Sequence, residues 1–152
     1  MTGSEQLVAR AAIHDELCRL ALAQDDRDWP TLTDCYCVDA VYRHPGGELV
    51  GVEAIVERTR VALSPLDASQ HLLGTILVAV DGETATSSTY FQAQHVKVGT
   101  PGGDHLIIAG TYRDRWSYEN GRWQIAERVQ TYSWRDGNPE VTRRDRPPTE
   151  AS

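Results

Sequence analysis

Residues 70–98 read QHLLGTILVAVDGETATSSTYFQAQHVKV, and their pattern decides the fold. The run 70–80 is β-branched and apolar, and residues 84–98 are rich in Thr, Ser, Tyr and Phe, so both are typical of strands. Asp81-Gly82-Glu83 between them is a hairpin turn sequence. Strands and turns continue to alternate after this hairpin. A turn at 99–104 leads to a strand at 105–118, and a turn at 119–122 leads to the last strand at 123–134. The sequence therefore predicts a four-stranded antiparallel meander.

Before this meander the apolar residues follow helical spacing. From Glu5 to about Gln24 they recur at three- and four-residue steps, the period of an amphipathic helix. Two further helices are predicted at Trp29–Cys35 and Gly51–Leu63, with a short strand at Ala40–His44. Helices followed by a meander indicate an α+β domain. If the long strands curl around the helices, the sheet forms a cone whose pocket suits a small apolar molecule.

Length and charge narrow the possible functions. The 152 residues suffice for one domain, which we place at 1–134, and the Arg-, Asp- and Pro-rich tail at 135–152 has no period. Its run Arg143-Arg144-Asp145-Arg146 is predicted to be solvated. A formal net charge of −7 repels phosphate backbones, so nucleic acid is not an expected partner. No apolar stretch approaches the roughly twenty residues that span a bilayer, so no membrane is expected either.

The cysteines and histidines give no sign of a metal or other cofactor. Cys18, Cys35 and Cys37 form no zinc-binding pattern, and we expect reduced thiols in a cytoplasmic protein. The beginning of the chain has no basic and apolar leader, which agrees with that location. His44, His71 and His95 lack the tight spacing of metal ligands, and no glycine fingerprint for a dinucleotide occurs. We therefore expect no cofactor.

Asp25 and His71 are the predicted catalytic pair. The buried stripe of the first helix, through Ile13, Leu17 and Ala21, leads to Asp25 at the helix end, where its side chain would face the pocket. A carboxylate at the closed end of an apolar cavity is costly without a partner, and an imidazole is a natural one. His71 opens the first long strand, and an aspartate that fixes its tautomer would make it a general base near neutral pH. From the pattern alone, both residues could instead be ordinary polar residues of the surface or of a strand.

His95 is predicted to face the same pocket from the second long strand. Whether it shares a face with His71 depends on the hairpin register. A three-residue loop that pairs Val80 with Thr84 puts both histidines on one side, whereas a two-residue turn puts them on opposite sides. We expect the three-residue loop. The alternative for His95 is an exposed strand histidine.

Three more residues are predicted to bind the substrate. Tyr42 and His44 alternate to one face of the short strand, where a phenol could donate a hydrogen bond to a substrate carbonyl. Arg128, on the last strand, could bind an oxyanion or a leaving group. A half-buried strand tyrosine and an arginine in an ion pair are the structural alternatives.

The order of these elements resembles the SnoaL-like branch of the NTF2-like superfamily over about Leu7–Trp134. The resemblance rests on short pieces in a fixed order: Arg10-Ala-Ala-Ile-His-Asp15, Asp25, Asp28-Trp29, Asp39-Ala40, Gly51-x-Glu-Ala-Ile55, His71, Val80-Asp-Gly-Glu-Thr-Ala85, Gly110-x-Tyr112 and Gly121-Arg-Trp-Gln-Ile125. Asp25 and His71 look like the Asp–His dyad of scytalone dehydratase, lindane dehydrochlorinase and bile-acid dehydratase. His95 resembles the second histidine of scytalone dehydratase, which helps the hydroxyl depart, and Tyr42 resembles its first-strand tyrosine.

This resemblance implies an NTF2-like cone and a cofactor-independent, dehydratase-like lyase. The histidine would remove a carbon-bound proton from a small, cyclic, hydrophobic substrate while water or chloride leaves. An isomerase or cyclase of natural-product biosynthesis would use the same base. From a different class, a non-catalytic module for small-ligand binding or subunit association remains open. The relatives also imply a homo-oligomer, either a trimer or a dimer.

Overall fold

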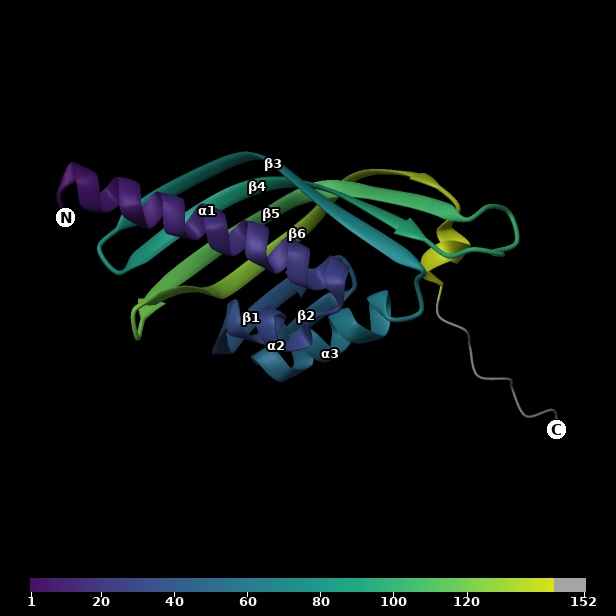
Figure 1. Cartoon of the computed structure of the whole chain (residues 1–152), viewed down its shortest axis with the longest axis horizontal. Coiled ribbons are helices and arrows are strands. Elements are labelled where there is room, and N and C mark those ends of the chain that lie inside the picture. Colours follow the sequence, from purple (N-terminus) through teal and green to yellow (C-terminus); the bar gives the residue numbers. More distant parts are fainter. Residues whose placement is uncertain (144–152) are drawn as a thin grey trace.

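The computed structural model describes residues 1–143, in which three α-helices lie within the curve of a six-stranded sheet (Figure 1). The elements are α1 Gly3–Asp26, α2 Trp29–Asp34, β1 Tyr36–His44, β2 Gly47–Val50, α3 Val52–Leu63, β3 Ala68–Asp81, β4 Thr84–Val96, β5 His105–Glu119, β6 Arg122–Gly137 and the 3-10 helix η1 Pro139–Thr142. The strand order is β2-β1-β6-β5-β4-β3, and every neighbouring pair is antiparallel except β1 with β6. The predicted α+β class and the meander of four long strands are confirmed.

Helix α1 has well-defined ends. A capping box begins it, in which the Thr2 side chain accepts from the Glu5 backbone and the Glu5 carboxylate accepts from the Thr2 backbone. Arg27 ends it in the left-handed conformation, with φ of 59°. The Arg27 guanidinium also donates to the backbone carbonyls of Gln24 and Asp25. Neither α1 nor any other helix within residues 1–143 is long and apolar enough to cross a membrane.

The short strand predicted at 40–44 belongs to a larger unit than its sequence indicates. In the structure β1 already begins at Tyr36, and it forms a hairpin with β2, a strand that the sequence analysis did not predict. On its other side β1 lies parallel to β6, with Val41 beside Glu127. This pairing attaches the helical half of the chain to the last strand of the meander.

The main core lies between the helices and the concave face of the sheet. Helix α1 buries the predicted stripe, with Ile13 and Leu17 fully inaccessible and Ala21 nearly so. Trp116 and Ile125 pack against this stripe from β5 and β6. Burial of each such large side chain stabilises the fold by about 1.5–3 kcal/mol.

Packing continues beyond the boundary predicted at residue 134. Strand β6 runs on to Gly137, and Val141 of η1 is only 1% exposed in a second cluster with Leu63, Leu66 and Leu106. Arg143, the first residue of the predicted basic run, forms an ion pair with Glu140 at 2.9 Å. The remainder of the predicted tail, 144–152, lies outside the described residues.

The turn between β3 and β4 is shorter than predicted. Asp81 pairs with Thr84, so the loop contains two residues and the predicted three-residue loop is wrong. Continued along the strands, this register would put His71 and His95 on opposite faces of the sheet. The two histidines nevertheless share a face.

A bulge in β3 accounts for this. The register shifts between Gly74 and Leu77, which adds one residue to β3 and reverses the faces of the residues before it. Thr75 in this bulge has φ of 48°, in the left-handed region that a β-branched residue rarely adopts. Beyond the bulge His71 lies opposite Ala93, so it shares the concave face with His95.

Two further register shifts, after Ala109 and after Arg115, bend β5 against β6. At the first of them the two strands approach closely, because a Cβ on Gly110 would lie 1.9 Å from the carbonyl oxygen of Thr131. Bulges increase the local bend and twist of a sheet. Together with the bulge in β3, they curve the sheet around the helices and leave space for a cavity at one end.

Replacing Thr75 with glycine should stabilise the protein by up to about 1 kcal/mol. The left-handed conformation costs a β-branched residue about 1–2 kcal/mol, whereas glycine adopts it freely at an entropic cost of about 0.5–1 kcal/mol. Thr86→Gly is the control, because Thr86 is also an exposed threonine but its backbone is extended, and it should lose about 1 kcal/mol. Urea unfolding measures both changes in the free energy of unfolding. If Thr75→Gly and Thr86→Gly destabilise the protein equally, the backbone at Thr75 is not strained.

Candidate active site

Asp25 and His71 meet where the end of α1 packs against the start of β3. Oδ1 of Asp25 is 2.7 Å from Nδ1 of His71, and Oδ2 accepts the His71 backbone N–H at 2.8 Å. Their side chains are 18% and 6% exposed. Because an ionised carboxylate only accepts hydrogen bonds, the neutral imidazole carries its proton on Nδ1. This leaves the lone pair of Nε2 for the cavity that His71 lines.

The environment of Asp25 favours its ionised form. Burial alone would raise the pKa of the carboxyl group, but hydrogen bonds from the ring and backbone of His71, and from the hydroxyl of Ser69, lower the pKa below its ordinary value. The Ser69 hydroxyl accepts in turn from the Arg27 guanidinium at 2.7 Å. The sequence analysis missed Ser69 and Arg27, because their link to Asp25 exists only once α1 and β3 are side by side.

His95 lies beside His71 on the concave face. The ring centroids are 6.3 Å apart and the ring planes are nearly perpendicular, at 76°. His95 is 8% exposed, and its Nδ1 is 3.3 Å from the carbonyl oxygen of Leu106, to which it donates. Burial, and then the proximity of His71, lowers the pKa of the His95 imidazole. His95 also lines the cavity, and in its neutral ring, with Nδ1 donating to Leu106, Nε2 is a hydrogen-bond acceptor.

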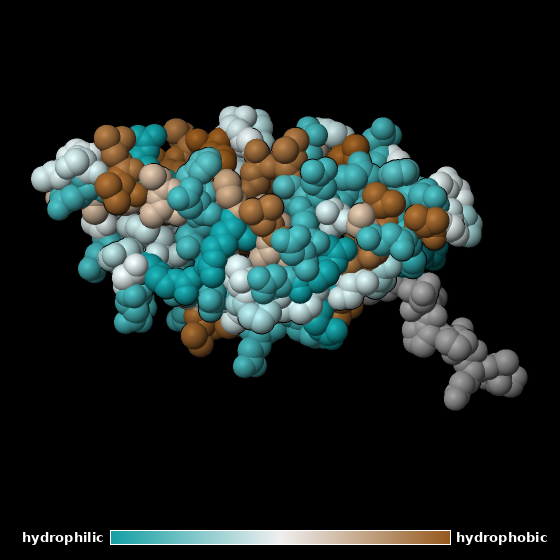
Figure 2. Space-filling view, in the orientation of Figure 1, coloured by the Kyte–Doolittle hydropathy of each residue, from teal (hydrophilic) through white to brown (hydrophobic). Residues whose placement is uncertain are grey.

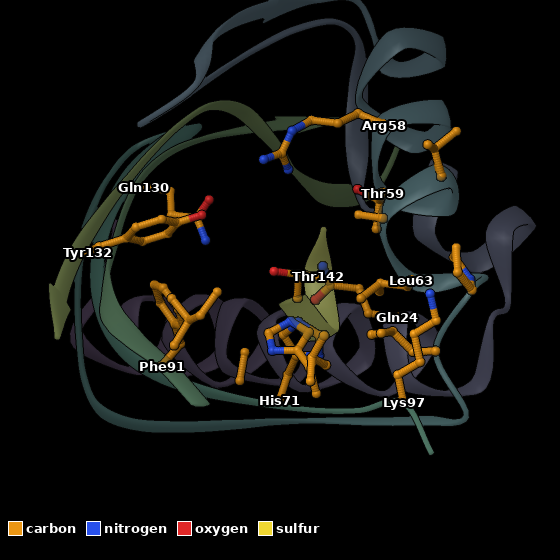
Figure 3. Close-up of a pocket in the computed structure, with 18 of the residues that line it drawn as sticks. Gln24, Arg58, Thr59, Leu63, His71, Phe91, Lys97, Gln130, Tyr132 and Thr142 are labelled. Atoms are coloured by element: carbon orange, nitrogen blue, oxygen red, sulfur yellow. The ribbon is translucent and has the colours of Figure 1, made fainter. Parts of the chain in front are cut away.

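A cavity of about 510 Å³ lies over the two histidines (Figure 3). Its apolar wall comes from the end of α3, the loop that follows it, β4 and β5, and includes Leu63, Leu66, Phe91, Ala93 and Ile108. Its polar lining includes Gln24, Tyr42, Arg58, Gln130, Tyr132 and Thr142. Figure 3 shows Arg58 across the cavity from His71, with Gln130 and Tyr132 on the wall between them.

Tyr42 lines the cavity, but its hydroxyl is already engaged. The phenol donates to Oε1 of Gln130 at 2.6 Å, so it is not available in this arrangement to donate to a substrate carbonyl as predicted. Burial raises the pKa of Tyr42, which favours the phenol over the phenolate. With Oε1 of Gln130 occupied, the amide N–H groups of Gln130 are the donors that remain. Gln130 was missed, although it stands two residues after Arg128 and the period of a strand puts both on one face.

His44 does not line the cavity. Its Nδ1 lies 2.9 Å from the backbone N–H of Gly46 and 3.3 Å from a guanidinium nitrogen of Arg58, and it accepts from both. Burial, and then the charge of Arg58, lowers the pKa of His44. Arg58 itself lines the cavity, and it was not predicted because the apolar spacing of 51–63 indicates a helix but not which of its polar side chains reaches a pocket. No three His, Cys, Asp or Glu side chains within residues 1–143 are arranged to hold a metal ion.

Arg128 does not line the cavity either, and its predicted substrate-binding role is replaced by a structural one. Its Nε and Nη2 donate to the two carboxylate oxygens of Asp114, at 2.7 and 2.8 Å. Both side chains are almost inaccessible, at 2% and 0%. The guanidinium carbon lies 3.9 Å from the centre of the Tyr112 ring. The structure thus has the arginine in an ion pair, as the sequence alternative proposed.

The fold and the site together define a class of protein. Helices and a strongly curved, unclosed sheet enclose one end cavity, with polar side chains from several elements directed into it, which is the NTF2-like cone. The chain belongs to the SnoaL-like domain family, whose family model matches residues 5–129. The predicted resemblance is confirmed. No curated protein matches the chain in sequence.

Solved structures share this fold at low sequence identity. A candidate scytalone dehydratase from Novosphingobium aromaticivorans is 17% identical with a TM-score of 0.80, over 87% of this chain and 89% of that chain. The hexachlorocyclohexane dehydrochlorinase LinA-type3 from Novosphingobium barchaimii is 18% identical with a TM-score of 0.77, over 88% and 92%. Rv3472(D26N), a Mycobacterium tuberculosis protein of unknown function, is 23% identical with a TM-score of 0.77, over 86% and 75%. At these identities the similarity shows the fold.

Asp114→Asn should destabilise the protein by about 3–5 kcal/mol, because it leaves the Arg128 guanidinium buried without its counter-charge. The double variant Asp114→Leu with Arg128→Met removes both charges and should recover most of this loss. Arg115→Gln, one residue along β5 with a side chain that is 74% exposed, is the control and should change stability by less than about 0.5 kcal/mol. Urea unfolding measures all three, and a stable Asp114→Asn variant would refute the structural role.

Proposed function

We propose that the protein is a cofactor-independent, dehydratase-like lyase that acts on a small cyclic substrate with a carbonyl group. The observation that carries the proposal is the hydrogen bond between Asp25 and Nδ1 of His71, which leaves Nε2 of His71 for the cavity that this residue lines. The names of two proteins of similar fold, a dehydratase and a dehydrochlorinase, describe eliminations and support the same reaction class.

In this mechanism His71 is the general base. Its Nε2 takes the proton from the carbon next to the substrate carbonyl, and the electron pair of that bond forms a carbon–carbon double bond. The bond from the neighbouring carbon to the hydroxyl oxygen breaks, and the imidazolium of His71 returns the proton to that oxygen, so that water leaves. Asp25 stabilises the imidazolium between the two transfers.

Two other polar groups hold the substrate oxygens. The amide N–H of Gln130, oriented by Tyr42, donates to the carbonyl oxygen as negative charge develops there. The neutral His95 accepts a hydrogen bond from the substrate hydroxyl, which keeps that leaving group beside His71. The apolar wall around them excludes bulk water and strengthens both interactions.

The alternative functions make different demands on the site. An isomerase or cyclase of natural-product biosynthesis would use the same base but would return the proton to carbon, so its product has the mass of the substrate. A non-catalytic binding module has no need of a buried, oriented base. The hydrogen bond of Asp25 to His71, a residue that lines the cavity, therefore favours an enzyme over a binding module.

His71→Ala and Asp25→Asn should each lower turnover by about 10²- to 10⁴-fold, because one removes the base and the other its orientation. Elimination of water from cyclic β-hydroxy ketones, beginning with 3-hydroxycyclohexanone, is followed by the absorbance of the conjugated enone. Asp26→Asn is the control, since Asp26 is the next carboxylate along the chain but is exposed. Unchanged turnover in His71→Ala would eliminate the mechanism.

We also propose that the chain forms a homo-oligomer, a dimer or a trimer, through the outer face of β3 and β4. Strand β3 is an edge of the sheet, and large apolar side chains are exposed on this face. Leu72, Leu77 and Tyr90 are 62%, 69% and 57% exposed. Figure 2 shows hydrophobic residues along the upper side of the molecule, where β3 and β4 run in Figure 1. A long, apolar edge strand pairs with another chain unless it is covered.

Light scattering should give two or three times the chain mass of 16.9 kDa. Leu72→Glu combined with Leu77→Glu should yield a monomer, because the charges oppose burial of this face. Leu22→Glu, at an equally exposed leucine on α1, is the control and should leave the mass unchanged. A monomeric wild-type protein would refute the assembly.

A further inference from the structure

The cavity is lined by three cationic side chains and by no carboxylate of residues 1–143, although the chain carries a formal net charge of −7. The cations are Arg58, Lys97 and Arg143, and Lys97 is the only lysine of the chain. Asp25 lies behind His71 and does not contribute to the lining. A concave site that gathers one sign of charge attracts a ligand of the opposite sign.

Arg58 is the cation best placed to bind such a ligand. The Arg143 side chain is 73% exposed and pairs with Glu140, and Lys97 follows the last residue of β4 at the rim. Arg58 is half-buried on α3, and Figure 3 shows its guanidinium projecting into the cavity across from His71. No carboxylate of residues 1–143 forms an ion pair with Arg58, so its charge remains available to a ligand.

Neutral groups hold this guanidinium in place. One of its nitrogens donates to Nδ1 of His44, which also accepts the Gly46 backbone N–H, so that Nδ1 carries no proton of its own. The guanidinium carbon lies 5.8 Å from the centre of the Tyr42 ring, within reach of a cation–π interaction. Because an arginine has five N–H donors, these contacts leave others to face the cavity.

We propose that Arg58 binds a carboxylate of the substrate, with His44 as its positioning residue. The substrate class is then a small cyclic β-hydroxy carbonyl compound that also bears a carboxylate on the side away from the reacting carbon. The planar guanidinium matches a carboxylate through paired hydrogen bonds, and Lys97 and Arg143 attract the anion to the cavity mouth. The reaction assigned to this substrate rests on the proposed function, whereas the carboxylate site does not.

Calorimetric binding of trans-cinnamate and trans-cinnamamide tests the site, because the two probes have the same shape and differ in charge. The wild-type protein should bind the acid at least about ten-fold more tightly than the amide at pH 7 and low salt. Arg58→Gln should bring this ratio close to one and leave the affinity for the amide unchanged, which also shows that the variant is folded. Arg60→Gln is the matched control, since Arg60 lies on the same helix but is exposed and paired with Glu57.

His44→Leu should lower the affinity for cinnamate and not that for cinnamamide, a difference that a merely structural role would not produce. The proposal is overturned if the wild-type protein does not prefer the acid, or if the preference survives in Arg58→Gln. If Lys97→Gln loses the preference and Arg58→Gln keeps it, the proposal is also overturned, because the carboxylate then binds to Lys97. His71→Ala should keep the preference, so the carboxylate site and the catalytic dyad can fail independently.

Discussion

The buried carboxylate of Asp25 is the constraint on which the rest of the site depends. A carboxylate that is only 18% exposed is stable in its ionised form if hydrogen bonds replace lost water, and Asp25 accepts three, from the ring and backbone of His71 and from Ser69. To receive them, α1 must end beside the start of β3. The left-handed Arg27 ends the helix there, and its side chain also holds Ser69. One set of hydrogen bonds thus orients the His71 ring and joins helix to sheet.

Local pattern predicted the parts of the fold that neighbouring residues determine. The helical spacing of α1 led to Asp25, and the strand and turn signals between residues 70 and 134 gave the meander in its correct order, because both periods are set within a few residues. The parallel pairing of β1 with β6 joins residues as distant in sequence as Val41 and Glu127. No periodicity within either segment specifies such a partner, so this pairing and the β2 hairpin were not predicted.

The shared face of His71 and His95 was predicted correctly but for a wrong reason. The expected three-residue loop is absent, and the bulge at Thr75 provides the extra residue instead. Gly74 is the one local sign of this bulge, since a glycine within a strand often marks one, but the β-branched Thr75 disfavours the left-handed conformation that it adopts. Without it His71 would face outward and could not bond its ring to Asp25. The tertiary contact therefore stabilises a local conformation that the residue itself opposes.

Two of the predicted polar residues, Tyr42 and His44, form hydrogen bonds with longer side chains that line the cavity, Gln130 and Arg58. These partners were not predicted, because the alternation of a strand shows which side chains point inward but not which longer side chain reaches the cavity. The position of Arg58 carries a further implication. A half-buried guanidinium with only neutral partners is costly, and the chain has twenty-two acidic residues that could neutralise it. Since none of those within residues 1–143 does so, a negatively charged ligand is the partner that would complete the site.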